Sequence, residues 1–203
     1  MIRLLLVRHG ETDWNAQRRY QGQTDVPLNE TGQRQVAALA KHLAGEEISA
    51  ILASDLQRAR QTALAIAAHH GLPFREEPRM REIALGDWEG LAYAQVRERW
   101  AEKMNAWFAD PLHVAPPGGE TLAQVADRVQ SVIEEVTRLG VDGTVILASH
   151  GGPLRVLLCL VLGMDVQAHW RFRLDVASIS ELHVHDGDVT LVRLNDTHHL
   201  DTL

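Results

Sequence analysis

Positively charged and imidazole side chains follow three short apolar runs of this sequence. The runs span residues 4–7, 50–53 and 145–148, and the side chains that follow them are Arg8, His9, Arg58 and His150. In an open α/β sheet, ligands bind beyond the carboxyl ends of the strands, so we expect these side chains to meet at one edge. Any one of them alone is more often structural than catalytic. Together they would concentrate positive charge in a chain whose net charge is −7.

Such a cluster suits a dianionic phosphoryl group. The rigid, forked donors of Arg8 and Arg58 match its oxygens. Histidine can act as a covalent nucleophile, and at neutral pH much of it is unprotonated and able to attack phosphorus without a general base, so His9 or His150 could take this role. The other histidine, in its protonated form, would join the arginines in neutralising charge on the equatorial oxygens of the transition state. These residue types therefore predict phosphoryl transfer.

Transfer of a phosphoryl group to water also needs a proton donor for the leaving alcohol and, later, a base for the attacking water. One carboxyl group can perform both steps. Glu82, in the segment Arg81-Glu82-Ile83, is our candidate for this group.

The elements that must position these residues follow from the spacing of apolar side chains. The three runs predict buried strands, because they are short and continuously apolar. Helical spacing predicts a helix capped by Thr31, a helix from Ser54 toward Gly71, a helix over residues 93–107, a helix over residues 122–136 capped by Thr121, and an apolar, buried helix that begins near Pro153. This alternation of strands and helices predicts an α/β fold.

Two further segments carry turn signals. Residues 178–184 and 189–194 flank Asp186-Gly187, and this pattern predicts an antiparallel hairpin. The segment from Asp110 to Glu120 is rich in proline and glycine. It is either a lid over the site or a plain connection.

Composition excludes several classes of protein. The 203 residues are 45% hydrophobic, which is sufficient for one core, so we expect a single domain over residues 1–203. The net charge of −7 argues against nucleic acid or an anionic membrane as a partner. No segment reaches the roughly 20 apolar residues that span a bilayer, and Arg8 interrupts the apolar start of the chain, unlike in a signal peptide. The single cysteine, Cys159, cannot form an intrachain disulfide, which favours the cytoplasm.

No cofactor and no metal ion is expected. The chain has 11 histidines, and His183 and His185 share one face of a predicted strand, which raises metal binding as an alternative. However, no cysteine pair and no His-Glu-x-x-His spacing accompanies them. Trp100 and Trp107 lie on a helical stripe and are expected in the core or in an interface. An exposed apolar helix face would support a homodimer.

The segment Leu6-Val7-Arg8-His9-Gly10-Glu11-Thr12, followed by Trp14-Asn15, resembles the signature of the histidine phosphatase superfamily in its cofactor-dependent phosphoglycerate mutase branch. Four more blocks occur in the order of that family, so the resemblance covers essentially the whole chain: Ser54-Asp55-Leu56-Gln57-Arg58-Ala59, Arg81-Glu82-Ile83, Gly118-Gly119-Glu120-Thr121 and Ser149-His150-Gly151-Gly152. The implied fold is a phosphoglycerate mutase-like, three-layer α/β/α sandwich with a mixed, mainly parallel central sheet.

The resemblance also implies roles for individual residues. His9 would be the phosphorylated nucleophile, and Glu82 the proton donor and later the base. The phosphate would be held by a group of residues consisting of Arg8, Asn15, Arg58, His150 and Gly151. The segment from Arg19 to Gly22, which resembles metal-independent phosphoserine phosphatases, adds Gln21 and Gly22 as substrate-binding residues.

Within the superfamily the chain lacks the longer insertion and extended tail of the glycolytic mutases, so a phosphatase is expected. Residues 85–90 and 169–175 resemble α-ribazole phosphatases and broad-specificity bacterial phosphatases, whereas residues 195–200 resemble phosphoserine phosphatases. By the latter resemblance His199 would contact the substrate at the mouth of the site; the alternative is a frayed tail. The expected partner is a small phosphorylated metabolite such as phosphoserine or α-ribazole phosphate. Phosphoglycerate mutase-type transfer and a non-catalytic phosphate-binding protein are the alternative functions.

Overall fold

The computed structural model describes residues 1–138, 143–185, 187–201 and 203. Within these residues the centre of the molecule is one sheet of six strands in the order β3-β2-β4-β1-β5-β6. Their bounds are β1 (Ile2–Arg8), β2 (Ile48–Ala53), β3 (Arg75–Glu76), β4 (Gly143–Ser149), β5 (Ile179–His185) and β6 (Asp188–Asp196). The pairs among β1 to β4 are parallel, whereas β5 is antiparallel to both β1 and β6. The prediction of a mixed, mainly parallel sheet is confirmed.

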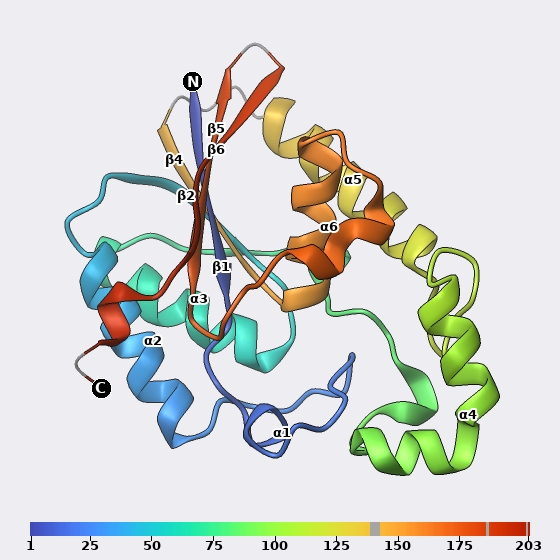
Figure 1. The fold of residues 1–203 in the computed structure, drawn as a ribbon. Coiled ribbons are helices and arrows are strands. Elements are labelled where there is room, and N and C mark those ends of the chain that lie inside the picture. Colours follow the sequence, from blue (N-terminus) through green and yellow to red (C-terminus); the bar gives the residue numbers. More distant parts are fainter. Residues whose placement is uncertain (139–142, 186, 202) are drawn as a thin grey trace.

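Helices cover both faces of this sheet (Figure 1). Their bounds are α1 (Asp13–Ala16), α2 (Glu30–Leu43), α3 (Gln57–His70), α4 (Tyr93–Ala109), α5 (Leu122–Arg138) and α6 (Gly151–Val161), with 3-10 turns η1 (Pro78–Met80), η2 (Gly86–Trp88), η3 (Val166–Arg171) and η4 (His198–Leu200). In Figure 1, α2 and α3 lie on one side of the sheet and α5 and α6 on the other, while α4 lies farther out beyond α5 and α6. The predicted three-layer sandwich is therefore the observed architecture.

The burial of β1 shows why its sequence is continuously apolar from Leu4 to Val7. Alternate side chains of a strand point to opposite faces of the sheet. Leu4 and Leu6 belong to the core on the side of α5 and α6, and Leu5 and Val7 belong to the core on the side of α2 and α3. Both faces of β1 are buried from Leu4 to Val7, so these positions favour apolar residues, whereas Arg3 before them is partly exposed and forms ion pairs with Glu46 and Glu181.

Two predicted helix caps are wrong. The helix expected to start at Thr31 begins at Glu30, and Asn29 caps it, because the Asn29 side chain accepts a hydrogen bond of 2.8 Å from the backbone N–H of Gly32. Ser54 does not cap α3, which begins at Gln57 and has no side-chain cap. The hydroxyl of Ser54 contacts an imidazole ring instead, as described below.

The other predicted elements agree with their patterns, and the structure adds α1, β3 and the 3-10 turns. The predicted helix over residues 93–107 is α4, but it is bent at Trp100, which has φ −136° and ψ 41°. The two-residue strand β3 was not predicted. The expected hairpin is β5 and β6, although Asp186 of its turn lies outside the described residues. Among the described residues, no helix is long and apolar enough to cross a membrane.

Candidate active site

The carboxyl ends of β1 and β4 open on a cavity of about 310 Å³. Its lining combines residues from the strand ends with residues from α6, η3 and α4. They are Arg8, His9, Asn15, Arg19, Tyr20, Gln21, Glu82, Ile83, Leu85, Trp107, Gly151, Gly152, Arg155, His169 and Trp170. The sheet edge that was predicted to bind the ligand is therefore hollow, and the hollow contains His9 and Glu82 together.

The hydrogen bond of His9 determines which of its nitrogens can react. The ring is buried, and its Nδ1 lies 2.7 Å from the backbone carbonyl oxygen of Gly10. Because a carbonyl only accepts, Nδ1 carries the proton and Nε2 carries the lone pair. Burial, followed by the nearby charges of Arg58 and Arg8, holds the pKa of His9 well below its ordinary value. His9 is thus a neutral imidazole with a nucleophilic Nε2 at neutral pH.

His150 lies next to His9, with ring centroids 5.0 Å apart, and is fixed from both sides. Its Nδ1 accepts a hydrogen bond of 3.1 Å from Nε of Arg58, and its Nε2 donates one of 2.8 Å to the Ser54 hydroxyl. Burial and the charge of Arg58 lower the pKa of His150 well below the ordinary value. The expectation of a protonated second histidine is therefore wrong, because a guanidinium donor occupies the nitrogen that would have to take the proton.

Arg58 is completely buried and supports the site from behind. Besides binding His150, its Nη1 donates to the carbonyl of Thr24 at 3.0 Å and its Nη2 to the carbonyl of Gly22 at 2.7 Å. Burial lowers its pKa to about 10, so the group is still cationic at neutral pH. Its charge helps to lower the pKa of His9 and of His150, and its hydrogen bonds to Gly22 and Thr24 hold the segment that carries Gln21.

Three buried N–H groups of the cavity lining have no acceptor in the described part of the protein; that of Arg155 is discussed below, and the other two belong to Arg8 and Gln21. One is Nε of Arg8, whose Nη1 donates to the carbonyl of Leu174 at 2.5 Å. The other is Nε2 of Gln21, whose Oε1 accepts a hydrogen bond of 2.8 Å from the Thr12 hydroxyl. Buried donors are normally paired, so these two point to a hydrogen-bonding ligand that accepts. Asn15, which caps α1 together with Thr12, lines the same region.

The carboxyl group of Glu82 lies at the start of α6. Its oxygens accept hydrogen bonds from the backbone N–H of Gly152 at 3.1 and 3.3 Å, and Oε1 also accepts one from that of Ile83 at 2.9 Å. The carbonyl of Glu82 is held by Gln23 and Arg128 at 3.1 and 3.2 Å. Both ends of the residue are therefore fixed, and the carboxyl group faces the cavity that contains His9.

The structure brings most of the predicted site residues together. Arg8, His9, Asn15, Gln21, Glu82 and Gly151 line the cavity. Arg58, His150 and Gly22 do not line it but form the buried layer behind His9. The segment 110–120 contributes no lining residue. It is a connection, tied to the chain beside it by hydrogen bonds from Asp87 to Pro117 and from Glu120 to Ala84.

His199 lies away from the position that was predicted for it. Its Nε2 donates to the carbonyl of Ala177 at 3.0 Å, and its ring stacks on His42 of α2 with centroids 5.4 Å apart. It is not part of the cavity lining. The tail is docked on α2, so it is neither frayed nor at the mouth of the cavity.

Several lining residues were not identified from the sequence. Arg155 and His169 stand in no strand-end motif, and Arg155 is the single charged residue of α6. The isolated charge of Arg155 in an otherwise apolar helix is the feature of the sequence that could have identified it as a site residue. Among the described residues no group of three or more His, Cys, Asp or Glu side chains could hold a metal ion.

A sequence model of the histidine phosphatase superfamily (branch 1) matches residues 4–197. Phosphoserine phosphatase 1 of Hydrogenobacter thermophilus is 39% identical over 200 residues, which are 98% of this chain and 95% of that protein. The solved structure of a putative alpha-ribazole-5'-P phosphatase from Escherichia coli has a TM-score of 0.91 at 32% identity and 97% coverage of both chains. A mycobacterial glucosyl-3-phosphoglycerate phosphatase in complex with VO3 has a TM-score of 0.85 at 36% identity, covering 95% of this chain and 98% of that one. The chain therefore belongs to the histidine phosphatase superfamily and is an enzyme with phosphatase activity.

Proposed function

We propose that this enzyme hydrolyses small phosphate monoesters through a phosphohistidine formed on Nε2 of His9. The observation that carries the proposal is the neutral, buried imidazole whose hydrogen-bonded Nδ1 leaves Nε2 unprotonated in a cavity that also contains Arg8 and Glu82. Nothing has to remove a proton from this nucleophile before it attacks.

In the first step Nε2 of His9 attacks phosphorus while the bond from phosphorus to the ester oxygen breaks. Glu82, in its protonated form, gives its proton to the departing alkoxide, which leaves as a neutral alcohol. The charges of Arg8 and Arg58 and the N–H of Gln21 compensate the charge on the phosphoryl oxygens.

In the second step water attacks phosphorus and the bond from phosphorus to Nε2 breaks. The Glu82 carboxylate accepts the proton that the water loses, which restores the acid for the next cycle. His9 returns to its neutral state and inorganic phosphate leaves. The proton that enters with the water thus replaces the one that left with the alcohol, so the two steps balance.

The substrate is a small molecule in this proposal. The cavity volume of about 310 Å³ lies at the lower end of the range of roughly 300–1,000 Å³ that is usual for ligand pockets. The names of the relatives offer phosphoserine, α-ribazole phosphate and glucosyl-3-phosphoglycerate as candidates. A reducing compartment such as the cytoplasm fits the single, buried thiol of Cys159.

The test is phosphate release from phosphoserine, α-ribazole phosphate, a sugar phosphate and 3-phosphoglycerate in excess EDTA, for wild type and His9→Ala. We expect release by the wild type with and without EDTA, and its loss in the variant. His113→Ala, which removes an exposed imidazole, is the matched control and should retain the wild-type rate.

A label on the phosphoryl group that moves from the substrate to the protein, and is stable in alkali but lost in acid, would identify the phosphohistidine directly. Absence of release from every ester contradicts the proposal. In that case conversion of 3-phosphoglycerate to its 2-phospho isomer would indicate transfer between substrates.

A further inference from the structure

Arg155 is a cation that the proposed phosphate chemistry does not use. It lies on α6, where it is the single charged residue, and it lines the cavity. Residues three and four apart share a helix face, so Arg155 follows Gly151 and Gly152 by one turn, about 5–6 Å along the helix axis. The cavity therefore has a second cationic position, displaced by roughly one helical turn from the glycines beside His9 and Glu82.

The charge of Arg155 has no counterion among the described residues. Its Nε is buried without a hydrogen-bond partner, and the ring of Trp170 packs against it with 5.7 Å between Cζ and the ring centroid. Burial lowers the pKa of Arg155, whereas the more distant charges of Glu82 and Asp175 act in the opposite direction. Asp175 is itself engaged by Nε of Arg173 at 3.0 Å and by Nδ2 of Asn195 at 2.9 Å. A partly desolvated guanidinium without a partner is a binding site for an anion.

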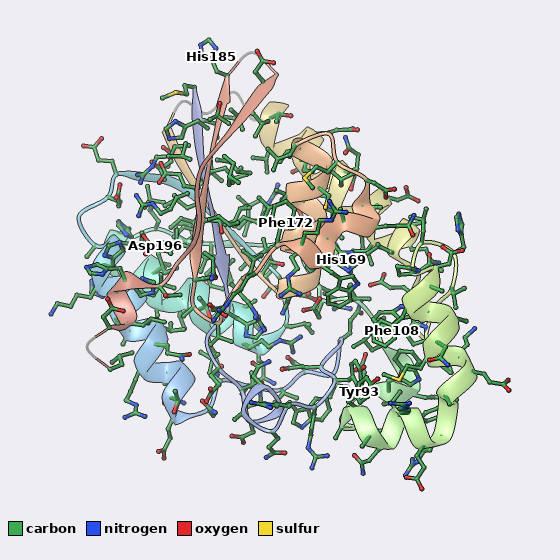
Figure 2. All side chains as sticks on the ribbon, viewed as in Figure 1. Tyr93, Phe108, His169, Phe172, His185 and Asp196 are labelled. Carbon is green, nitrogen blue, oxygen red and sulfur yellow. The ribbon has the colours of Figure 1, made fainter. Side chains whose placement is uncertain are left out.

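His169, which is labelled in Figure 2, lies on η3, which packs on α6. It lines the same cavity as Arg155, and the charge of Arg155 acts on its ring, so it adds an acceptor near this cation. The ring is buried and its Nδ1 donates to the carbonyl of Val166 at 2.9 Å, so Nε2 carries the lone pair. Nε2 has no partner in the described part of the chain. Burial lowers the pKa of His169 to about 4, which keeps the ring neutral at physiological pH. Its Nε2 can accept a hydrogen bond from a hydroxyl or ammonium group.

We infer that Arg155 and His169 form the subsite for the alcohol part of the substrate, and that this part carries a carboxylate with a hydroxyl or ammonium group beside it. The substrate class is then the phosphate monoesters of hydroxy acids, including hydroxy amino acids. A phosphate dianion at His9 faces Arg8, with the charge of Arg58 in the buried layer behind His9, and the carboxylate is the third negative charge, for which Arg155 is the cation. The inference rests on the proposed function, since it assumes that the phosphate end lies at His9.

The test compares esters that differ only in the carboxylate. 3-Phosphoglycerate is paired with glycerol 3-phosphate, and phosphoserine with phosphoethanolamine. A charge-assisted hydrogen bond changes an equilibrium by roughly ten- to a hundredfold, so we expect the wild-type kcat/KM to favour the carboxylate of each pair by that factor. Arg155→Gln should bring the ratio close to one, mainly through KM. Arg171→Gln, which removes an exposed charge from the same 3-10 turn, should keep the wild-type ratio.

Other outcomes separate this inference from the proposed function. Hydrolysis of p-nitrophenyl phosphate with a kcat/KM ratio near one for both pairs contradicts the subsite and leaves the phosphatase mechanism intact. A preference for the carboxylate ester that is unchanged in Arg155→Gln also contradicts the subsite. If the wild type hydrolyses none of the esters, the proposed function fails. The subsite can then still be tested by calorimetry, which compares the affinity for 3-phosphoglycerate with that for glycerol 3-phosphate. Equal affinities refute the subsite. If Arg155→Gln does not fold, the wild-type ratios decide, with Arg155→Lys expected to retain part of the preference.

Discussion

At position 152 only a hydrogen atom fits between the backbone and the carboxyl group of Glu82. The N–H of Gly152 binds both carboxyl oxygens, and a Cβ at this residue would overlap Oε1. Gly152→Ala therefore has to displace the proposed proton donor. A positioned acid contributes roughly 10²–10⁴-fold to a rate, so we expect kcat for an alkyl phosphate to fall within that range.

The dependence on the leaving group distinguishes this effect from general damage to the site. p-Nitrophenolate leaves with little need for a proton, so Gly152→Ala should lose much less activity on p-nitrophenyl phosphate than on an alkyl phosphate. Gly151→Ala is the comparison, since its Cβ would meet the Arg8 guanidinium carbon at an ordinary 3.6 Å. Its effect should be smaller and equal for both esters. Equal losses for both esters in Gly152→Ala would refute the role of Glu82 as the acid.

Among individual residues, those that directly follow strands could be predicted from the sequence. Arg8, His9 and His150 follow apolar runs whose carboxyl ends must meet in a parallel sheet. Arg155 and His169 could not be assigned in this way, because their approach to the cavity depends on how α6 packs on η3. The protonation states of the histidines could not be predicted either, because they depend on burial and, for His150, on a hydrogen bond from Arg58, which is far away in the chain.

At the level of elements, two glycines near helix ends give a matched pair for stability. Gly71 ends α3 with φ +63°, where an L side chain is strained, whereas Gly45 follows α2 without a positive φ. A Cβ at either position would have nothing within 4 Å. Gly71→Ala should lower the free energy of unfolding by about 1 kcal/mol, and Gly45→Ala should leave it unchanged or raise it by roughly 0.4–1 kcal/mol. Urea unfolding measures both, and equal effects would contradict the argument.

The strands and helices differ in how clearly the sequence specifies them. β1, β2 and β4 contain the buried, continuously apolar runs 4–7, 51–53 and 145–148, so their patterns predict them. β3 has only two residues, both exposed, and it exists because Arg75 and Glu76 pair with the end of β2. The order of the strands is likewise a property of tertiary packing. The cap at Asn29 was missed because Thr31, two residues later, is also a good capping residue.

Among the described residues three imidazoles are buried and a fourth, that of His199, is half-buried; all four have a lowered pKa, and this makes the stability of the protein depend on pH. Burial is the main cause of the lowered pKa of His9, His150, His169 and His199. In the unfolded chain each of them regains an ordinary pKa of about 6.5. Below that pH the unfolded chain binds protons that the folded chain does not, so the free energy of unfolding falls as the pH falls.

We expect the free energy of unfolding to be nearly constant above pH 7 and to decrease between pH 6.5 and 5.5, before the carboxyl groups titrate. His169 isolates one contribution, because its ring is buried and its pKa is lowered to about 4. A histidine that stays neutral in the folded state contributes about 1.4 kcal/mol to the decrease between pH 7.5 and 5.5. Urea unfolding of His169→Gln at these two pH values should show a decrease smaller than that of the wild type by this amount. The same decrease in both proteins would mean that His169 takes up a proton in the folded state, and its Nε2 could not then act as a hydrogen-bond acceptor for the substrate at that pH.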